Sequence, residues 1–329
     1  MRIIAFAAAT APAIIILFYF LEAARVRMFS RQVWSAFGFG ACAVFLALFV
    51  AFGTSFLAIG EANPYLAQAH RAFLQAAVPE ETAKFLALLT VIGRRHHEVA
   101  PNRLFILAIA VAVGFACLEN IFYVLEGSVW AATAAVRSIS AVPGHAFGGA
   151  VMGFCVVRAR AGRHNSLWWF LALIVPIGLH GTYDFFLFML SETTGLYATM
   201  PQKLSGTFIA LFMFVFLIEA ALAHLALISV IRSPRAVIEK RDRLTVDPIA
   251  RGTAKKVDDG VALWRGLGVI CFLGCFFIVS MVARDISADS GNSWAGDYLM
   301  LGFALFTCFH GVAFFGLAKI IVRRGEREK

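Results

Sequence analysis

LFILAIAVAVGFACLENIFYVLE, residues 104–126, is an almost unbroken apolar run with a single acid before its last residue, Glu119, which Asn120 follows. An α-helix rises 1.5 Å per residue, so this run is long enough to cross a hydrocarbon core of about 30 Å. A charged group at such a depth is energetically unfavourable and usually serves a function. The stretch therefore predicts a membrane-spanning helix and marks Glu119 as a candidate functional residue.

The composition of the whole chain agrees with this interpretation. Hydrophobic residues make up 60% of the 329 positions, and the mean hydropathy is +0.80. Soluble domains contain roughly 45–50% apolar residues. The net charge of +9 would suit a nucleic-acid partner if the basic residues formed one surface, but they lie in the gaps between apolar segments. We therefore predict a membrane protein whose partner is the lipid bilayer and not a nucleic acid.

Segments long enough to span the bilayer recur along the chain and predict an all-α fold, a polytopic transmembrane helix bundle of about nine spans. The third segment is the least apolar, because it carries Glu80, Glu81 and Lys84. The predicted spans are residues 3–22, 35–59, 72–92, 104–126, 136–157, 168–190, 206–231, 265–283 and 298–321.

The distribution of Lys and Arg predicts the orientation of these spans. Most of the 29 basic residues lie in every second connection, and the connection at 232–263 is the most basic of all. Cytoplasmic loops of membrane proteins are enriched in Lys and Arg. The amino terminus is therefore predicted outside and the carboxyl terminus in the cytoplasm, with residues 232–263 at the inner surface.

Four consecutive predicted spans carry ionisable groups at similar depths. Counted from the outer end of each span at 1.5 Å per residue, Glu80 lies about 12 Å deep, Glu119 about 10 Å, His145 about 14 Å and Asp184 about 9 Å. Structural polar residues scattered over a bundle would have no reason to agree in depth. The agreement predicts one water-filled cavity that opens to the outer face.

Spacing within the third and sixth spans predicts which side chains meet. Glu80 and Lys84 are four residues apart, so they share a helix face and can form an ion pair. Glu81 is then expected to point elsewhere, about 100° around the helix. His180 and Asp184 also share a face, so the carboxylate can orient the imidazole, or both can reach one ion.

These groups are suited to hydrolysis by acid and base catalysis. A glutamate can take a proton from water, while His and Asn120 donors hold the tetrahedral intermediate. The alternative without chemistry is a polar network that only holds helices together.

Four ordered motifs on four successive spans resemble the PrsW family of intramembrane proteases, which is related to the CAAX prenyl endopeptidases and more distantly to the Aph-1 subunit of gamma-secretase. The resemblance covers residues 72–190. The motifs are Glu80-Glu81-x-x-Lys84, Gly114-Phe115-Ala-x-x-Glu119-Asn120, His145 with the following Gly148-Gly149, and His180-Gly-x-Tyr-Asp184-Phe185.

This resemblance implies an endopeptidase of the bacterial inner membrane that cuts a single-pass membrane protein near its extracytoplasmic side. In the best-known members the substrate is an anti-sigma factor. The catalytic core would be residues 72–190, between N-terminal helices at 1–71 and C-terminal helices at 191–329. Nothing in the sequence indicates an oligomeric state. The predicted site residues are Glu80, Glu81, Glu119, His145, His180 and Asp184 as the catalytic set, with Lys84 and Asn120 in support.

A metal ion is a second possibility at this site. The chain has no H-E-x-x-H motif, but Glu119, His145, His180 and Asp184 have the donor atoms that zinc prefers. A metal-free mechanism is favoured here, because the adjacent glutamates then have a role as the base that activates water.

Two functions without proteolysis stay open at this point. A proton-coupled transporter would also place Glu, His and Lys inside the membrane, but such proteins contain repeated spans and no motif here occurs twice. A non-catalytic scaffold of the Aph-1 type would keep the polar packing without hydrolysis. Glu219 and His224 in the span 206–231 match no motif, and Glu219 is predicted to be a hydrogen-bonding group between helices.

Overall fold

The computed structural model describes residues 2–57, 63–93, 99–126, 130–161, 165–193, 200–201 and 204–232. Every regular element within these ranges is a helix, as the sequence predicts. The predicted spans 265–283 and 298–321, and all but the first residue of the basic connection, lie outside the described residues. The elements are α1 (Arg2–Ala23), α2 (Arg31–Ser55), α3 (Pro64–Ala69), η1 (His70–Ala77), α4 (Val78–Ile92), α5 (Pro101–Glu126), α6 (Trp130–Ile139), α7 (Ala141–Ala161), α8 (Asn165–Thr193) and α9 (Ser205–Ile231).

Six segments in the described part of the chain are long and apolar enough to cross a membrane, which supports a multi-pass integral membrane protein. They overlap six predicted spans, whereas the predicted span 72–92 is not among them because of its charged residues. Nine crossings and the orientation of the termini stay predictions. The six segments are Ile3–Ala23, Arg31–Ser55, Pro101–Glu126, Trp130–Ala161, Ser166–Thr193 and Ser205–Ile231.

The described residues up to Met189 and from Ile218 onward form one compact unit, and Leu190–Leu217 belongs to a second. The first unit therefore contains α1 to α7, most of α8 and the second half of α9. The end of α8 and the first half of α9 are the described helices of the second unit. All predicted site residues lie in the first unit. The grouping into three sequence blocks stays a prediction.

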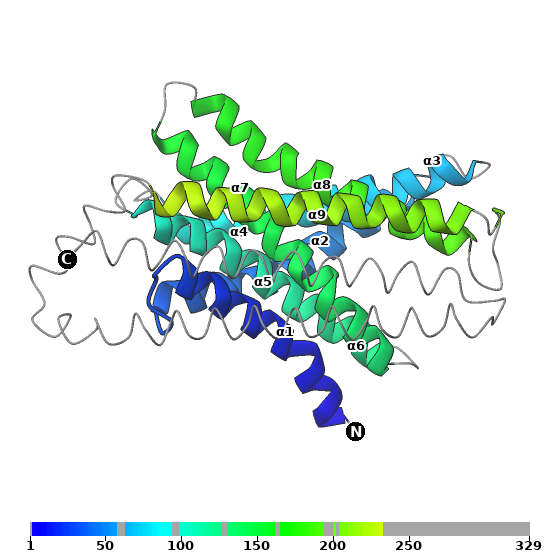
Figure 1. Ribbon diagram of the computed structural model, residues 1–329, viewed down its shortest axis with the longest axis horizontal. Coiled ribbons are helices and arrows are strands. Elements are labelled where there is room, and N and C mark those ends of the chain that lie inside the picture. The colour runs from blue at the N-terminus through cyan, green and yellow to red at the C-terminus, as the bar shows by residue number, and fades with distance from the viewer. Residues whose placement is uncertain are drawn as a thin grey trace, which may run out of the picture. The chain divides into compact units, whose positions relative to one another are not determined.

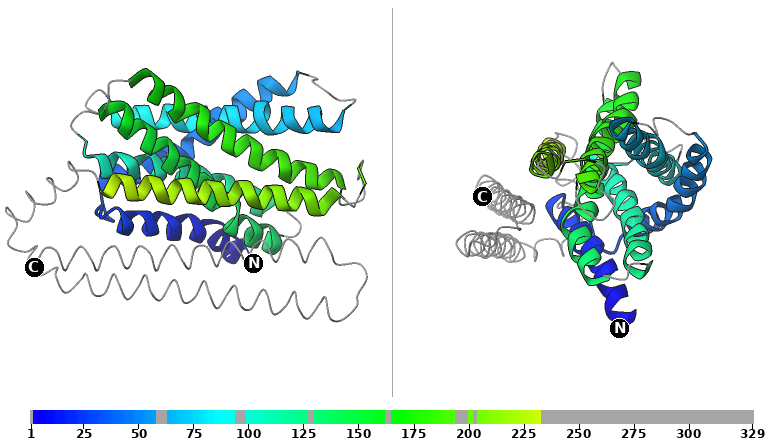
Figure 2. Two further views of the ribbon diagram at one scale, coloured as in Figure 1. Left: turned by 45° about the horizontal axis from the view of Figure 1, so that its top comes forward. Right: turned by 90° about the vertical axis from the view of Figure 1, so that its right-hand side faces the viewer.

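Helix α5 is the centre of the first unit, because α1, α2, α4, α6 and α7 all pack against it (Figures 1 and 2). Its side chains from Leu104 to Cys117 are all buried. Many of them are alanine, glycine or valine, and small residues let membrane helices approach closely. The stretch that carries Glu119 is thus held on several sides by other helices.

The closest packing in this unit joins α5 to α2. A Cβ atom at Gly114 of α5 would overlap the backbone carbonyl of Phe37, and one at Gly40 of α2 would overlap the carbonyl of Val111. Each helix therefore supplies one glycine at which the backbone of the other passes. This contact lies little more than one helical turn from Glu119 and sets the position of that part of α5.

We expect Gly114→Ala to destabilise the folded protein by about 1–3 kcal/mol, because the added methyl group cannot be accommodated without moving α2. The measurement is the thermal midpoint of the purified protein in detergent. Gly38→Ala is the matched control, since a Cβ at Gly38 meets no atom within 4 Å. Equal midpoints for the two variants would contradict this account of the α2–α5 contact.

The helical run from Pro64 to Ile92 contains a π-helical segment, η1, directly before the glutamate pair. Pro79 follows this segment, and its ring would clash with the carbonyl four residues earlier in a regular α-helix. The wider turns avoid the clash, and the N–H of Val78 bonds to the carbonyl of Phe73, five residues earlier. Such segments often lie at functional sites. Here η1 places Glu80 and Glu81 in the first turn of α4.

The predicted span 136–157 is longer in the structure and consists of two helices, α6 and α7, that meet at Ser140. Pro143 lies in the first turn of α7, where its missing N–H leaves the carbonyl of Ile139 without its usual donor. The break separates Arg137, near the end of α6, from His145, near the start of α7. Both side chains belong to the site described next.

Candidate active site

Lys84 lies at the centre of a buried polar cluster, with 1% of its surface exposed. Its ammonium Nζ donates to Glu81 Oε1 at 2.7 Å, Glu80 Oε2 at 3.3 Å and His145 Nδ1 at 2.8 Å. The pair with Glu80 was predicted, but the expectation that Glu81 points elsewhere is wrong. Residues three apart on a helix are also neighbours, and the long lysine side chain reaches both carboxylates.

His145 links this ammonium to Glu119 of α5. A lysine ammonium has only donors, so Nδ1 of His145 accepts from it and the ring proton is on Nε2. That Nε2–H donates to Glu119 Oε2 at 2.8 Å. The tautomer of His145 is therefore determined by its two neighbours, and this histidine joins the α4 and α5 acids through α7.

His180 of α8 contacts three carboxylates. Nδ1 lies 2.8 Å from Glu81 Oε1, and Nε2 lies 3.2 Å from Asp184 Oδ2 and 3.9 Å from Glu80 Oε2. The predicted pairing with Asp184, one turn later on the same helix, is present. The His180 and His145 rings are edge to face, with centroids 5.2 Å apart. A histidine with carboxylates at both nitrogens is a group that can hold and release a proton.

Arg137 of α6 also belongs to the cluster, although the sequence analysis assigned it no role. Its Nη2 lies 3.0 Å from Glu119 Oε2, its Nε donates to Asn120 Oδ1 at 2.9 Å, and its guanidinium stacks over the Tyr123 ring at 3.9 Å. The predicted span begins at residue 136, so the sequence places Arg137 at the outer end of that span, next to a connection. An arginine within an apolar helix was the signal that could have found it.

Asn120 does not point toward the glutamate pair. It is fully buried, and its amide nitrogen donates to the backbone carbonyl of Ala9 in α1 at 2.7 Å. Its oxygen accepts from Arg137. The structure therefore does not support the predicted use of Asn120 as a donor to a reaction intermediate. Asn120 instead accepts a hydrogen bond from Arg137.

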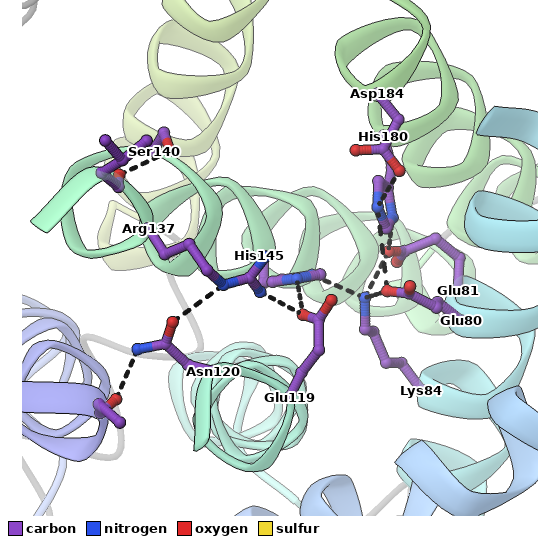
Figure 3. A network of polar contacts seen from close by, with 12 residues as sticks. Glu80, Glu81, Lys84, Glu119, Asn120, Arg137, Ser140, His145, His180 and Asp184 are labelled. Carbon is purple, nitrogen blue, oxygen red and sulfur yellow. Dashed lines mark hydrogen bonds and ion pairs between the residues drawn. The ribbon is translucent and has the colours of Figure 1, made fainter. Parts of the chain in front are cut away.

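Figure 3 shows the whole arrangement. Side chains from α4, α5, α6, α7 and α8 form one chain of contacts that runs from Asn120 through Glu119, His145 and Lys84 to Asp184. All six residues predicted as catalytic are thus brought together. Their individual roles in catalysis stay predictions.

A metal ion would find a partly suitable set of donors here. Ligand atoms of Glu80, His145 and His180 all lie within 4.8 Å of one another, and two histidines with one glutamate form a common catalytic zinc site. The predicted ligand set is thereby changed: Glu80 joins the two histidines, Glu119 contacts Nε2 of His145, and Asp184 contacts Nε2 of His180, the nitrogen that Glu80 also approaches.

The Lys84 ammonium lies in contact with two members of this donor set, Glu80 and His145. It already provides a positive charge to them and donates to the Nδ1 lone pair of His145. A metal ion that used this nitrogen would have to displace the ammonium.

Glu219 and His224 of α9, which match no motif, lie in the same unit. His224 is held by the Tyr19 hydroxyl at 2.7 Å from its Nε2 and by the Ala220 carbonyl at 2.7 Å from its Nδ1, so it fastens α9 to α1. Glu219 is buried as well. Its predicted role between helices stays a prediction.

The comparisons with known proteins agree with the motifs. Residues 30–223 match the family model described as PrsW family intramembrane metalloprotease. Three proteins named Protease PrsW are similar to the chain. That of Bacillus subtilis (strain 168) is 37% identical over 36% of this chain and 55% of its own length. The chain thus spans about half the length of this relative.

The second and third relatives are covered more fully. The protein of Shouchella clausii (strain KSM-K16) is 33% identical over 44% of this chain and 66% of its own length. That of Geobacillus kaustophilus (strain HTA426) is 31% identical over 58% and 82%. No solved structure matches the chain. The family model covers more than half of the chain and includes every residue of the buried cluster, so the chain belongs to the PrsW family of intramembrane proteases.

Proposed function

We propose that this protein is an intramembrane endopeptidase that hydrolyses a peptide bond of a single-pass membrane protein, with Glu80 as the base that activates water. One observation carries the proposal: the two adjacent glutamates are not equivalent. Glu81 is 4% exposed and its Oε1 is held by both Lys84 and His180, whereas Glu80 is 16% exposed and its contacts are longer. Glu80 is therefore the carboxylate that is free to bind a water molecule.

The reaction follows from these contacts. Glu80 takes a proton from water, and the hydroxide attacks the carbonyl carbon of the scissile bond. Donors at the cluster stabilise the negative oxygen of the tetrahedral intermediate. The carbon–nitrogen bond then breaks, and the leaving amine takes a proton from the acid form of Glu80 or from His180. Glu81, Glu119 and Asp184 keep Lys84 and the two histidines in place.

The predicted orientation of the spans supports the substrate class and the side of the membrane that we propose. If the basic connections are cytoplasmic, Glu119 and Asp184 lie toward the extracytoplasmic ends of α5 and α8, whereas His145 lies near the middle of its span. A membrane-anchored protein of the anti-sigma-factor kind, cut near that side, fits such a position. Its single transmembrane helix would bring the scissile bond to the depth of Glu80.

The proposal is metal-free, because the Lys84 ammonium already contacts Glu80, Glu81 and His145. Zinc, if bound, would be held by Glu80, His145 and His180 and would polarise the scissile carbonyl. We expect the purified protein to contain well under one zinc per chain and to keep its full cleavage rate after treatment with a chelator. Loss of cleavage with the chelator and recovery with zinc would overturn the metal-free mechanism but not the protease assignment.

The experiment that tests the protease itself uses the full chain in liposomes, mixed with single-pass reporter proteins that carry different juxtamembrane sequences. Cleavage of at least one reporter is expected, with new termini located by mass spectrometry near the extracytoplasmic side. A scaffold or a transporter would leave every reporter intact. Cuts near the cytoplasmic side would contradict the proposed orientation.

A further inference from the structure

We infer that Arg137 is a positioning residue, which holds Glu119 in place as the acceptor for the Nε2–H of His145 and thereby orients the imidazole ring. The consequence for cleavage rests on the proposed function, whereas the effect on the histidine does not. Arg137 lies outside the motifs that carry the family resemblance, on a helix that ends before the motif of His145 begins.

Three contacts hold the guanidinium of Arg137 in one orientation. Its Nε donates a hydrogen bond to Asn120 Oδ1 at 2.9 Å, its Nη2 forms an ion pair with Glu119 Oε2 at 3.0 Å, and its plane stacks over Tyr123. All three partners lie on α5, within little more than one turn of each other. A planar group held along its edge and over its face has little freedom to rotate.

Asn120 is itself oriented from outside the cluster. The Ala9 carbonyl can only accept a hydrogen bond, so the amide nitrogen of Asn120 must face α1 and its oxygen must face α6. The oxygen then accepts from Arg137 Nε, which can only donate. The backbone of α1 thereby determines which way the Asn120 side chain points, and Asn120 in turn fixes the position of Arg137.

Glu119 connects Arg137 to His145, because both contact its carboxylate. A guanidinium stays charged under all ordinary conditions, so it keeps Glu119 as an acceptor. Its Oε2 atom is approached by Arg137 at 3.0 Å and by His145 Nε2 at 2.8 Å. His145 must then donate from Nε2 and present the lone pair of Nδ1 to Lys84. Without Arg137, Glu119 is free to turn away, so the Nε2–H of His145 loses its acceptor, although Lys84 still donates to Nδ1.

The first test is the protonation of the His145 ring, measured by nitrogen-15 NMR of the full-length protein in lipid, with the His145 signals identified by their absence in His145→Gln. In the wild type, Nε2 is expected to carry the proton and Nδ1 to be unprotonated. In Arg137→Gln, Nδ1 should stay unprotonated because Lys84 still donates to it, whereas the Nε2 signal should shift because its proton loses the carboxylate acceptor. Identical His145 signals in both proteins would overturn the inference, whether or not the protein cleaves a substrate.

The second test is kinetic. Arg137→Lys keeps the charge but cannot reach Glu119 and Asn120 together, so kcat for reporter cleavage should fall about 10–100-fold, as for groups that orient catalytic histidines. KM and the thermal midpoint should stay near the wild-type values. Arg158→Lys is the matched control, since Arg158 stacks on Trp168 at 5.4 Å and lies in the last turn of α7, outside the cluster.

The outcomes separate the two ideas. If wild-type protein cleaves no reporter, the proposed function fails while the NMR result still decides the role of Arg137. If Arg137→Lys lowers the thermal midpoint with unchanged His145 signals, Arg137 only stabilises the fold and the positioning role is overturned.

Discussion

Glu80→Gln is expected to give a protein that folds as the wild type does but cleaves a reporter about 10²–10⁴-fold more slowly. Removal of a general base has effects of this size. Gln keeps the shape of the side chain, and Glu80 has the longer of the two contacts with Lys84, so the cluster loses little of its stability. Cleavage is measured in liposomes, and folding by the thermal midpoint in detergent.

The neighbouring residue provides the contrast. Glu81→Gln should lower the thermal midpoint, because Glu81 makes the shortest contact with the Lys84 ammonium and also contacts His180. Glu126→Gln is the control, since Glu126 is an exposed glutamate at the end of α5. If Glu80→Gln cleaves as fast as Glu126→Gln, Glu80 is not the base. A loss of activity in Glu81→Gln with an unchanged midpoint would transfer that role to Glu81.

The meeting of Glu80, Glu119, His145 and Asp184 could be predicted from the sequence because two quantities are nearly constant. A helix rises 1.5 Å per residue, and the membrane fixes where each apolar span begins and ends. Depth could therefore be counted on each span separately. The Glu80–Lys84 and His180–Asp184 pairs followed in the same way, from the spacing of neighbours on one helix.

What the sequence did not predict depends on rotations and breaks that counting does not include. Arg137 was missed because the helix starts at Trp130 and breaks at Ser140, so its side chain reaches back into the cluster. The direction of Asn120 depends on a backbone carbonyl in α1, more than 100 positions away along the chain. The direction of Asn120 leaves no local pattern in the sequence, whereas Arg137 lies within an apolar helix, which was the signal that could have found it.

The zinc ligands illustrate the same limit. Glu119, His145, His180 and Asp184 have the right donor types, but residue types do not show which atoms converge. In the structure ligand atoms of Glu80 and the two histidines lie within 4.8 Å of one another, and Glu119 and Asp184 each contact the Nε2 atom of one ring. Which carboxylate lies near both rings depends on how the helices pack, and residue types alone do not show this.

Lys84→Met is expected to abolish cleavage and to destabilise the protein by about 3–5 kcal/mol, the usual effect of removing one partner of a buried ion pair. Lys84 is 1% exposed, and its ammonium donates to two carboxylates and one imidazole. Without it, Glu80 and Glu81 both lose the ammonium, and His180 is a remaining group that contacts both carboxylates. Arg71→Met is the matched control, because Arg71 is an exposed cation on η1 of the same helical run.

The Lys84→Met variant also tests what the ammonium does. If its charge is what the acids and His145 require, added zinc should raise the thermal midpoint of Lys84→Met, since the metal then enters a site that the lysine has vacated. The wild type should show no such rise, because the ammonium already contacts Glu80 and His145. An equal rise in both proteins would mean that zinc and Lys84 are bound together, and the metal-free mechanism would have to be abandoned. A Lys84→Met protein as stable and active as Arg71→Met would remove the lysine from the site altogether.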